Sequence, residues 1–304
     1  MAGLSKLIIG LICMGILGAY APSVENDVIS SDASTPASGY YSAPALPLED
    51  QVMVHFIDVG QGDAIYIELP NDNNVLIDGG EKKDGAVVVD YLKAQGVDDL
   101  ELIIATHPHR DHIGGLPEIM AAYDVNTVLD SGQKAESNAY GLYAESIAKE
   151  GCSWVADNRQ VFTFGNIELQ ILTGTENWQD PNNYSVVAHL DCGEIEFLFM
   201  GDAEKQAEEM LTGNISAEIL KVGHHGSSSS SSASFLGRVM PDVAVISAGA
   251  GNSYGHPHEE TLNILNDAGC KMYRTDFDGN VVVTTDGKAF SVRSVKDLVG
   301  RTVL

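Results

Sequence analysis

Residues 106–115 read Thr106-His107-Pro108-His109-Arg110-Asp111-His112-Ile113-Gly114-Gly115, directly after the apolar run Leu102-Ile103-Ile104-Ala105. The run predicts a buried strand, and a strand ending at Thr106 presents His107 and His109 on one side of an extended segment. Asp111 and His112 follow where the chain turns, so they can face a second ion beside the first. Imidazole and carboxylate bind Zn, Mn or Fe, and two adjacent ions suit hydrolysis. The alternative is a histidine-rich surface turn, which the flanking strand and Gly-Gly disfavour.

The composition is that of a globular but strongly acidic protein. The chain has 304 residues, with 17 Lys and Arg against 43 Asp and Glu, and a formal net charge of −26. Binding to nucleic acid through phosphate neutralisation needs clustered Lys and Arg. We therefore expect no stable nucleic-acid complex, while a short phosphodiester site held by metal ions stays compatible with this charge.

The first fifty residues differ from the rest of the chain. Residues 1–21 combine Lys6, an apolar stretch at 7–18 and the small-x-small sequence Ala19-Tyr20-Ala21, which predicts a signal peptide or a membrane anchor. Residues 22–50 are rich in Ser, Ala and Pro, as in a flexible linker. We expect an exported protein, either extracellular or tethered to the membrane at the cell surface, with a hydrolase domain at 51–304. The sequence does not indicate an oligomeric state.

Residues 51–293 alternate short strand and helix patterns, which predicts an α/β fold. Expected strands include 52–59, 64–69, 75–78, 100–105 and 196–200, and expected helices include 84–95, 116–123 and 139–149. The serine run 227–232 has the composition of a mobile rim loop. The cysteines that would remain after cleavage, Cys152, Cys192 and Cys270, are widely spaced and indicate no disulfide framework.

Several polar residues stand at predicted strand ends or turns. Asp202 follows the strand 196–200, where α/β folds place active-site groups, although a helix N-cap is an alternative. His224 and His225 close a strand, and two adjacent imidazoles cannot both face one ion comfortably. His256 precedes a helix opened by a proline, so its ring can lie at the mouth of a site or serve as a surface cap. Asp78 and Asp63 occur in glycine-rich turns, where they can be turn formers.

The ordered blocks in residues 51–293 resemble the metallo-β-lactamase superfamily, and within it the C-terminal hydrolase domain of the competence protein ComEC. The blocks are Asp58-Val59-Gly60-Gln61-Gly62-Asp63, the His107 segment, Asn182-Asn183-Tyr184-Ser185, Gly201-Asp202, 221–227 and 252–257. This resemblance implies an αββα sandwich of two mixed sheets flanked by helices. It also implies two divalent ions, the first held by His107, His109 and Asp202, and the second by Asp111, His112, Asp202 and His225. Asp78 and Asp63 would orient these ligands.

The chain departs from the lactamases and glyoxalase-type thioesterases, which carry a third His before the bridging Asp, where this chain has Asn183 and Ser185. His189 lies in the next strand, and the pattern leaves its face open. We therefore predict a phosphodiesterase using two Zn or Mn ions and a hydroxide between them. Its substrate would be a nucleic acid, a nucleotide or a cell-envelope phosphodiester such as phosphorylcholine. The predicted catalytic residues are Asp111, His224 and His256, and the predicted substrate contacts are Asn183, Ser185 and Tyr254.

Two other functions fit the same residues. One is a carbonyl hydrolase that attacks a lactam, lactone or thioester at this site, which the missing third His disfavours. The other is a non-catalytic, metal-stabilised binding module of the cell envelope, which would bind metal without turnover.

Overall fold

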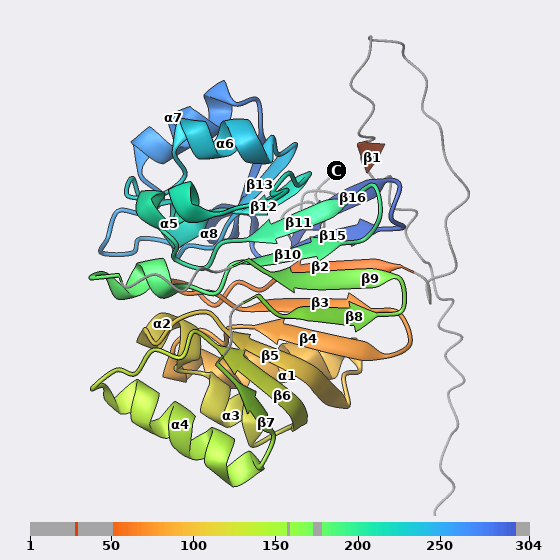
Figure 1. Ribbon diagram of the computed structural model, residues 1–304, viewed down its shortest axis with the longest axis vertical. Helices are drawn as coiled ribbons and strands as arrows, with labels where there is room; N and C mark the ends of the chain where they lie inside the picture. Colours follow the sequence, from red (N-terminus) through yellow and green to blue (C-terminus); the bar gives the residue numbers. More distant parts are fainter. Residues whose placement is uncertain (1–27, 30–50, 157–158, 173–177, 296–304) are drawn as a thin grey trace, which may run out of the picture.

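The structure, a computed structural model, describes residues 28–29, 51–156, 159–172 and 178–295. Two mixed β-sheets pack face to face, and helices cover the outer face of each sheet (Figure 1). The predicted αββα sandwich is therefore confirmed. Of the segment 1–50, only two residues are described, so the predicted signal peptide or anchor and nearly all of the predicted linker lie outside the described residues. Within the described ranges, no helix has the length and apolar character needed to cross a membrane.

The first sheet has nine strands in the order β1-β16-β15-β2-β3-β4-β5-β6-β7. Its strands are β1 (Val28–Ile29), β2 (Val52–Phe56), β3 (Ile65–Leu69), β4 (Asn73–Ile77), β5 (Asp99–Ala105), β6 (Asp124–Asp130), β7 (Ser153–Val155), β15 (Val281–Thr285) and β16 (Phe290–Ser294). The pairs β4–β5, β5–β6 and β6–β7 are parallel, and the others are antiparallel.

The second sheet has seven strands in the order β14-β13-β12-β11-β10-β9-β8. Its strands are β8 (Val161–Phe164), β9 (Ile167–Ile171), β10 (Ala188–Asp191), β11 (Glu196–Phe199), β12 (Ile219–Lys221), β13 (Val243–Ile246) and β14 (Lys271–Arg274). The strands β11 to β14 run parallel to one another, and β8 to β11 are antiparallel.

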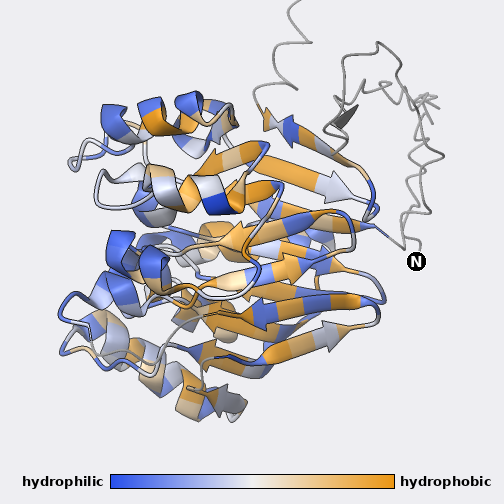
Figure 2. Cartoon of the chain, turned by 45° about the horizontal axis from the view of Figure 1, so that its top comes forward, coloured by the Kyte–Doolittle hydropathy of each residue, from blue (hydrophilic) through white to orange (hydrophobic). Residues whose placement is uncertain are grey.

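The inner strands β4, β5, β11 and β13 are mostly buried on both faces because each sheet is covered on both sides. In β11, Phe197 and Phe199 enter the core between the sheets, whereas Leu198 packs under the helices of the second sheet. In β4, Val75 and Ile77 face the central core and Leu76 faces the helices of the first sheet. Figure 2 shows the resulting concentration of hydrophobic residues along the strands.

The helices form two outer layers. On the first sheet lie η2 (Lys82–Asp84), α1 (Gly85–Gln95), α2 (Arg110–Ile113), α3 (Leu116–Met120) and α4 (Asn138–Glu150). The second sheet is accompanied by α5 (Lys205–Met210), α6 (Ala233–Val239), α7 (Glu259–Asp267) and α8 (Thr275–Asp278), with the short helices η3 (Pro181–Tyr184) and η4 (Gly223–Gly226) in its loops. Most predicted elements agree with these bounds within a few residues.

The serine run 227–232 is not the mobile rim loop that its composition predicted. Ser230 and Ser231 are buried, and the Ser230 hydroxyl donates to the carbonyl of Gly223 at 2.8 Å. The carboxylate of the buried Glu208, in α5, accepts the backbone N–H groups of Ser231 and Ser232. Composition alone suggested a mobile loop because Glu208 is distant in sequence. The Glu208 carboxylate accepts hydrogen bonds from backbone N–H groups that would otherwise need a water molecule.

Gly115 allows the His107 segment to pack directly against the loop after β4. A Cβ atom at Gly115 would lie 2.0 Å from the carbonyl oxygen of Gly79 and 3.1 Å from the Cα of Gly85. Both are backbone atoms, so a substitution forces the two loops apart.

We predict that Gly115→Ala lowers the free energy of unfolding by about 1–3 kcal/mol or more, because backbone must move to remove the overlap. Gly141 is the matched control, since it is exposed within α4 and a Cβ there meets nothing within 4 Å. Gly141→Ala should raise stability by up to about 1 kcal/mol through helix propensity. Urea unfolding of the metal-free proteins, followed by circular dichroism, measures both. Equal effects of the two substitutions would refute the close-packing argument.

Candidate metal centre

The candidate site forms where strand ends of both sheets meet. Asp78 follows β4, His107 follows β5, Asp202 follows β11, and His225 lies in η4 after β12. The carboxyl ends of parallel strands share one edge of a sheet, and ligand sites of α/β folds gather there. Because the two sheets face each other, residues more than a hundred positions apart converge.

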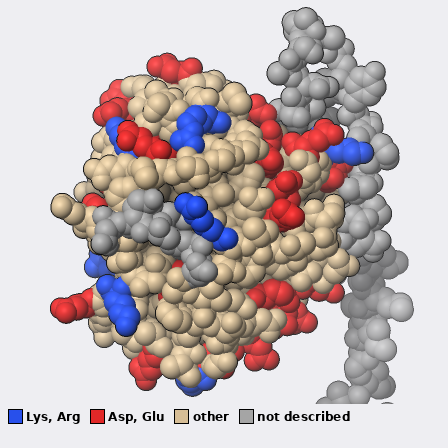
Figure 3. Space-filling model, viewed as in Figure 1, with Lys and Arg blue, Asp and Glu red and all other residues tan. Residues whose placement is uncertain are grey.

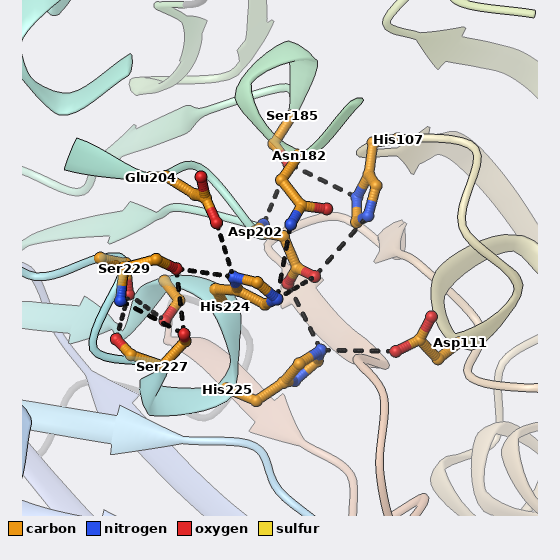
Figure 4. A network of polar contacts seen from close by, with 12 residues as sticks. His107, Asp111, Asn182, Ser185, Asp202, Glu204, His224, His225, Ser227 and Ser229 are labelled. Atoms are coloured by element: carbon orange, nitrogen blue, oxygen red, sulfur yellow. Dashed lines mark hydrogen bonds and ion pairs between the residues drawn. The ribbon is translucent and has the colours of Figure 1, made fainter. Parts of the chain in front are cut away.

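Asp202 lies at the centre of this cluster (Figure 4). Its Oδ2 atom is 3.6 Å from Nε2 of His107. Its Oδ1 atom is 3.3 Å from Nε2 of His112 and 3.4 Å from Nε2 of His225. All four residues are buried. One carboxylate therefore faces three imidazoles, with one oxygen toward His107 and the other toward the remaining pair.

Each of these imidazoles is held through its Nδ1 atom. Nδ1 of His112 lies 2.7 Å from Oδ2 of Asp78, and Nδ1 of His225 lies 3.0 Å from the carbonyl oxygen of Ser247. Nδ1 of His107 lies 3.2 Å from the hydroxyl of Thr106. Engaging Nδ1 in this way fixes the ring and leaves Nε2 available, which is the usual arrangement of metal-binding histidines.

The unpaired atoms match a metal site. Nε2 of His107, His112 and His225 and Oδ1 of Asp202 are buried without a hydrogen-bond partner among the described residues. Leaving such atoms unpaired costs about 1–3 kcal/mol each, and their convergence on one space indicates a shared cation. Ligand atoms of His107, His112 and Asp202 lie within 4.8 Å of one another, as do those of Asp111, His112 and His225. The donor set fits divalent metal binding.

Asp78 holds the His107 segment in place through hydrogen bonds. Its Oδ1 accepts the backbone N–H of Thr106 at 2.8 Å, and its Oδ2 accepts the hydroxyl of Thr106 at 2.7 Å. The same carboxylate contacts His112, so it ties both ends of the segment together. Asp78 thus occupies the position expected of a residue that orients the ligands.

Asp63 forms a buried ion pair with Lys221. Nζ of Lys221 lies 2.7 Å from Oδ2 of Asp63, and Oδ1 of Asp63 lies 3.4 Å from Nδ1 of His225. Burial opposes ionisation, but Lys221 and His225 hold the pKa of Asp63 well below its usual range. Lys221 received no role from the sequence. A lysine within the apolar run Ile219-Leu220-Lys221-Val222 was the signal for a buried partner.

Electrostatics distinguish the three central imidazoles. Burial and the neighbouring His112 hold the pKa of His107 well below its usual value. For His112, burial acts against the charged form, but Asp202 and Asp78 raise the pKa well above its usual value. His225 behaves likewise, because Asp202 and Asp111 outweigh its burial. Both shifts favour the protonated form of these two rings in the metal-free protein.

An open cavity of about 430 Å³ leads to the cluster. Its lining includes Gln61, His109, Arg110, Asp111, Asn182, Asp202, His224, His225, Tyr254 and His256. The ring of Tyr254 stacks on His256 with centroids 5.6 Å apart, and His256 stacks on His225 at 6.3 Å. The cavity thus has a buried, ligand-bearing floor and a partly exposed aromatic rim.

The remaining predicted ligands are nearby. His109 lines the cavity, with its ring centroid 4.6 Å from that of His107, but it belongs to none of the close three-residue groups. Oδ2 of Asp111 lies 3.6 Å from Nε2 of His225. His189 is now placed: its Nε2 contacts the carbonyl oxygen of Ser216 at 3.0 Å, and it does not line the cavity.

The backbone separates the two adjacent histidines. His224 and His225 both have left-handed φ, 49° and 54°, and their ring centroids are 6.2 Å apart. His225 belongs to the groups that can hold a metal, whereas His224 does not. Nδ1 of His224 instead contacts Glu204 at 3.2 Å and Ser229 at 3.1 Å (Figure 4). His258, which the sequence left as structural, accepts the backbone N–H of Ser228 at 2.9 Å.

Two predicted substrate contacts lie elsewhere. Asn183 and Ser185 are buried and do not line the cavity. The Asn183 Oδ1 accepts the N–H of Glu204 at 3.1 Å, and the Ser185 hydroxyl accepts the N–H of Asp202 at 3.0 Å. They hold the loop that carries Asp202, and the neighbouring Asn182 faces the cavity instead. A tight helical turn decides which of two adjacent asparagines points outward, and the sequence does not.

We predict that binding of divalent metal releases protons at pH 7. Metal ligation requires neutral imidazole, whereas His112 and His225 have raised pKa values in the metal-free protein. As pH rises through those values the competing protons leave, so apparent affinity should increase with pH. Calorimetric titration in two buffers of different ionisation enthalpy counts the protons. Equal heats in both buffers would contradict the prediction, and His112→Ala should reduce the count.

Comparison with known proteins agrees with this geometry. The sequence profile of the Metallo-beta-lactamase superfamily matches residues 57–250. ComE operon protein 3 of Bacillus subtilis (strain 168) is 31% identical over 263 residues, covering 78% of this chain and 33% of that protein. Competence protein ComA of Neisseria gonorrhoeae is 30% identical over 244 residues, covering 79% of this chain and 33% of that protein. The chain thus spans about a third of the length of these relatives.

Solved structures show the same fold. The metallo-beta-lactamase fold protein YhfI from Bacillus subtilis superposes with a TM-score of 0.50 at 12% identity, covering 77% of this chain and all of that one. At that identity the likeness concerns the fold alone. The profile match and the similarity to the competence proteins confirm the resemblance seen in the sequence. The chain belongs to the metallo-β-lactamase superfamily of hydrolases and is similar to the ComEC family within it.

Proposed function

We propose that this hydrolase is a phosphodiesterase that holds two divalent ions, Zn or Mn, at the Asp202 cluster. The supporting observation is the convergence of three unpaired Nε2 atoms on the two oxygens of Asp202 at the floor of an open cavity. His107, His109 and Asp202 would hold one ion, and Asp111, His112, Asp202 and His225 the other. Bound ions would neutralise phosphate charge and lower the pKa of a water molecule toward neutrality.

The side chains around the cavity suit a substrate with one negative charge. Among the described residues that line the cavity, Arg110 alone is a Lys or Arg. Its Nε atom lies 3.4 Å from Oε1 of Glu81. On the face drawn in Figure 3, Lys and Arg are scattered among Asp and Glu. Such a surface favours a small or zwitterionic diester over a long polyanion. Among the described residues, no His takes the place before Asp202 where lactamases carry their third ligand, which supports a diester over a lactam or thioester.

His256 is our candidate for contact with the leaving oxygen. Its Nδ1 is buried and has no hydrogen-bond partner among the described residues, and the residue lines the cavity. Burial, with the nearby His224 and His225, lowers the pKa of His256 to about 4. The ring is therefore neutral at pH 7 and can donate one hydrogen bond without adding charge. Tyr254, stacked on it, would contact the group beyond the scissile bond.

The proposed location is outside the cytoplasmic membrane. It rests on the apolar stretch at 7–18 and the polar segment that follows, both outside the described residues. Fractionation of cells producing the full chain tests it, and recovery with cytosolic proteins would refute it.

We predict that the full chain with added Mn or Zn hydrolyses bis(p-nitrophenyl) phosphate. Asp202→Asn should lower the rate about a hundredfold or more, since several kcal/mol of charge stabilisation is lost. Asp90→Asn is the matched control, because the Asp90 side chain is 82% exposed on α1. Cleavage of nitrocefin or a thioester without diester cleavage would favour the carbonyl hydrolase. Inactivity on all three by fully metallated protein would favour the binding module.

We further predict that His256→Ala is more damaging when the leaving group is poor. In the series bis(p-nitrophenyl), bis(p-chlorophenyl) and diphenyl phosphate, the loss should grow from a few-fold to about a hundredfold, because a poorer leaving oxygen carries more charge for the hydrogen bond from His256 to stabilise. Tyr254→Phe keeps the stacked ring, and any loss that it causes should be the same across the series. A uniform loss across the series would assign His256 to binding rather than to the leaving group.

A further inference from the structure

Asn182 is a buried polar residue at the cavity, and the proposed phosphodiesterase reaction gives it no role. It lies in η3, lines the cavity beside Asp202, and is 7% exposed. Its amide oxygen Oδ1 is buried and has no hydrogen-bond partner among the described residues. An unpaired buried carbonyl costs about 1–3 kcal/mol. An unpaired carbonyl oxygen at the cavity therefore indicates that a ligand or an ion binds to it.

A chain of hydrogen bonds sets the orientation of this amide. Oε1 of Glu204 lies 3.2 Å from Nδ1 of His224, and a carboxylate can only accept, so Nδ1 carries the proton and donates. Nε2 of His224 then has a lone pair, which accepts from the amide nitrogen of Asn182 at 3.4 Å. The nitrogen faces His224, so the oxygen faces away from it. Figure 4 shows that oxygen on the side of His107.

The position of the oxygen matches the less complete half of the metal centre. Oδ1 of Asp202 lies near both His112 and His225, whereas Oδ2 lies near His107, at 3.6 Å, with Nε2 of His224 at 3.8 Å. Nε2 of His224 is already engaged by Asn182. Besides His109, the proposed ligand of that ion, the His107 half thus has one imidazole near Asp202 where the other half has two, and Figure 4 shows the amide oxygen of Asn182 on its side. Amide oxygens bind hard divalent cations such as Mn²⁺.

We propose that the amide oxygen of Asn182 is a ligand of the divalent ion held by His107 and Asp202, and that Glu204, acting through His224, holds the amide in the ligating orientation. This inference rests on the proposed dinuclear centre. Glu204 and His224 are positioning residues in it, and Asn182 replaces the third imidazole that this chain lacks.

Manganese binding tests the proposal without any substrate. Metal-free full-length protein is titrated with MnCl₂ by calorimetry, and the cobalt-loaded protein is compared by visible absorption. Asn182→Leu keeps the size of the side chain but removes the donor, and it should weaken one of the two ions about tenfold and alter the cobalt spectrum. Asn182→Asp restores an oxygen donor and should bind that ion at least as tightly as the native chain.

The outcomes separate the two proposals. If the native chain binds no Mn²⁺, the proposed metal centre itself fails. If the native chain binds two ions and Asn182→Leu binds them with unchanged affinity and cobalt spectrum, only the role of Asn182 is overturned. Loss of an ion in His224→Ala but not in Asn182→Leu would make His224 the ligand and overturn it as well. Should Asn182→Leu fail to fold, weaker binding by Asn182→Asp would be decisive against the proposal.

Discussion

The structure depends on one electrostatic constraint, the burial of Asp202 among three imidazoles. A buried carboxylate is costly unless positive charge or hydrogen bonds compensate it. Here burial would raise its pKa, but His112 and His225 hold the pKa of Asp202 well below its usual value. If divalent metal binds as proposed, the same rings would lose their protons, and the cation would replace the protons as the compensating charge. The cluster is built for a positive charge in either state.

Around this centre, buried hydrogen bonds hold the residues of the cluster in fixed orientations. Asp78 fixes both Thr106 and His112, Ser247 fixes His225, and Ser185 fixes the backbone of Asp202. None of these contacts is made to a flexible surface side chain. Positioning ligands from buried strand ends and tight turns keeps their geometry constant, which metal catalysis requires.

The serine run extends this support to the cavity rim. Glu208 anchors it to α5, and Ser229 reaches Nδ1 of His224 beside Glu204. His224 and His225 adopt left-handed backbone conformations, which cost energy in non-glycine residues and occur at functional sites. The buried serines stabilise that turn, so a segment of low complexity has a defined structural task. Its composition conceals the task because the partners Glu208, Gly223 and His224 lie in other elements.

The sequence alone determined the fold family, most elements and most residues of the Asp202 cluster. His107, His109, Asp111 and His112 are close in the chain, so local spacing was enough to group them. Strand ends marked Asp78, Asp202 and the pair His224 and His225, of which the family resemblance favoured His225. Contacts between distant elements were decided only by the tertiary structure. It paired Lys221 with Asp63, turned Asn182 rather than Asn183 into the cavity, and joined Glu204 to His224. The physical reason is that periodicity reports which face is apolar, whereas the partner of a buried polar group depends on which loops the packed sheets bring together.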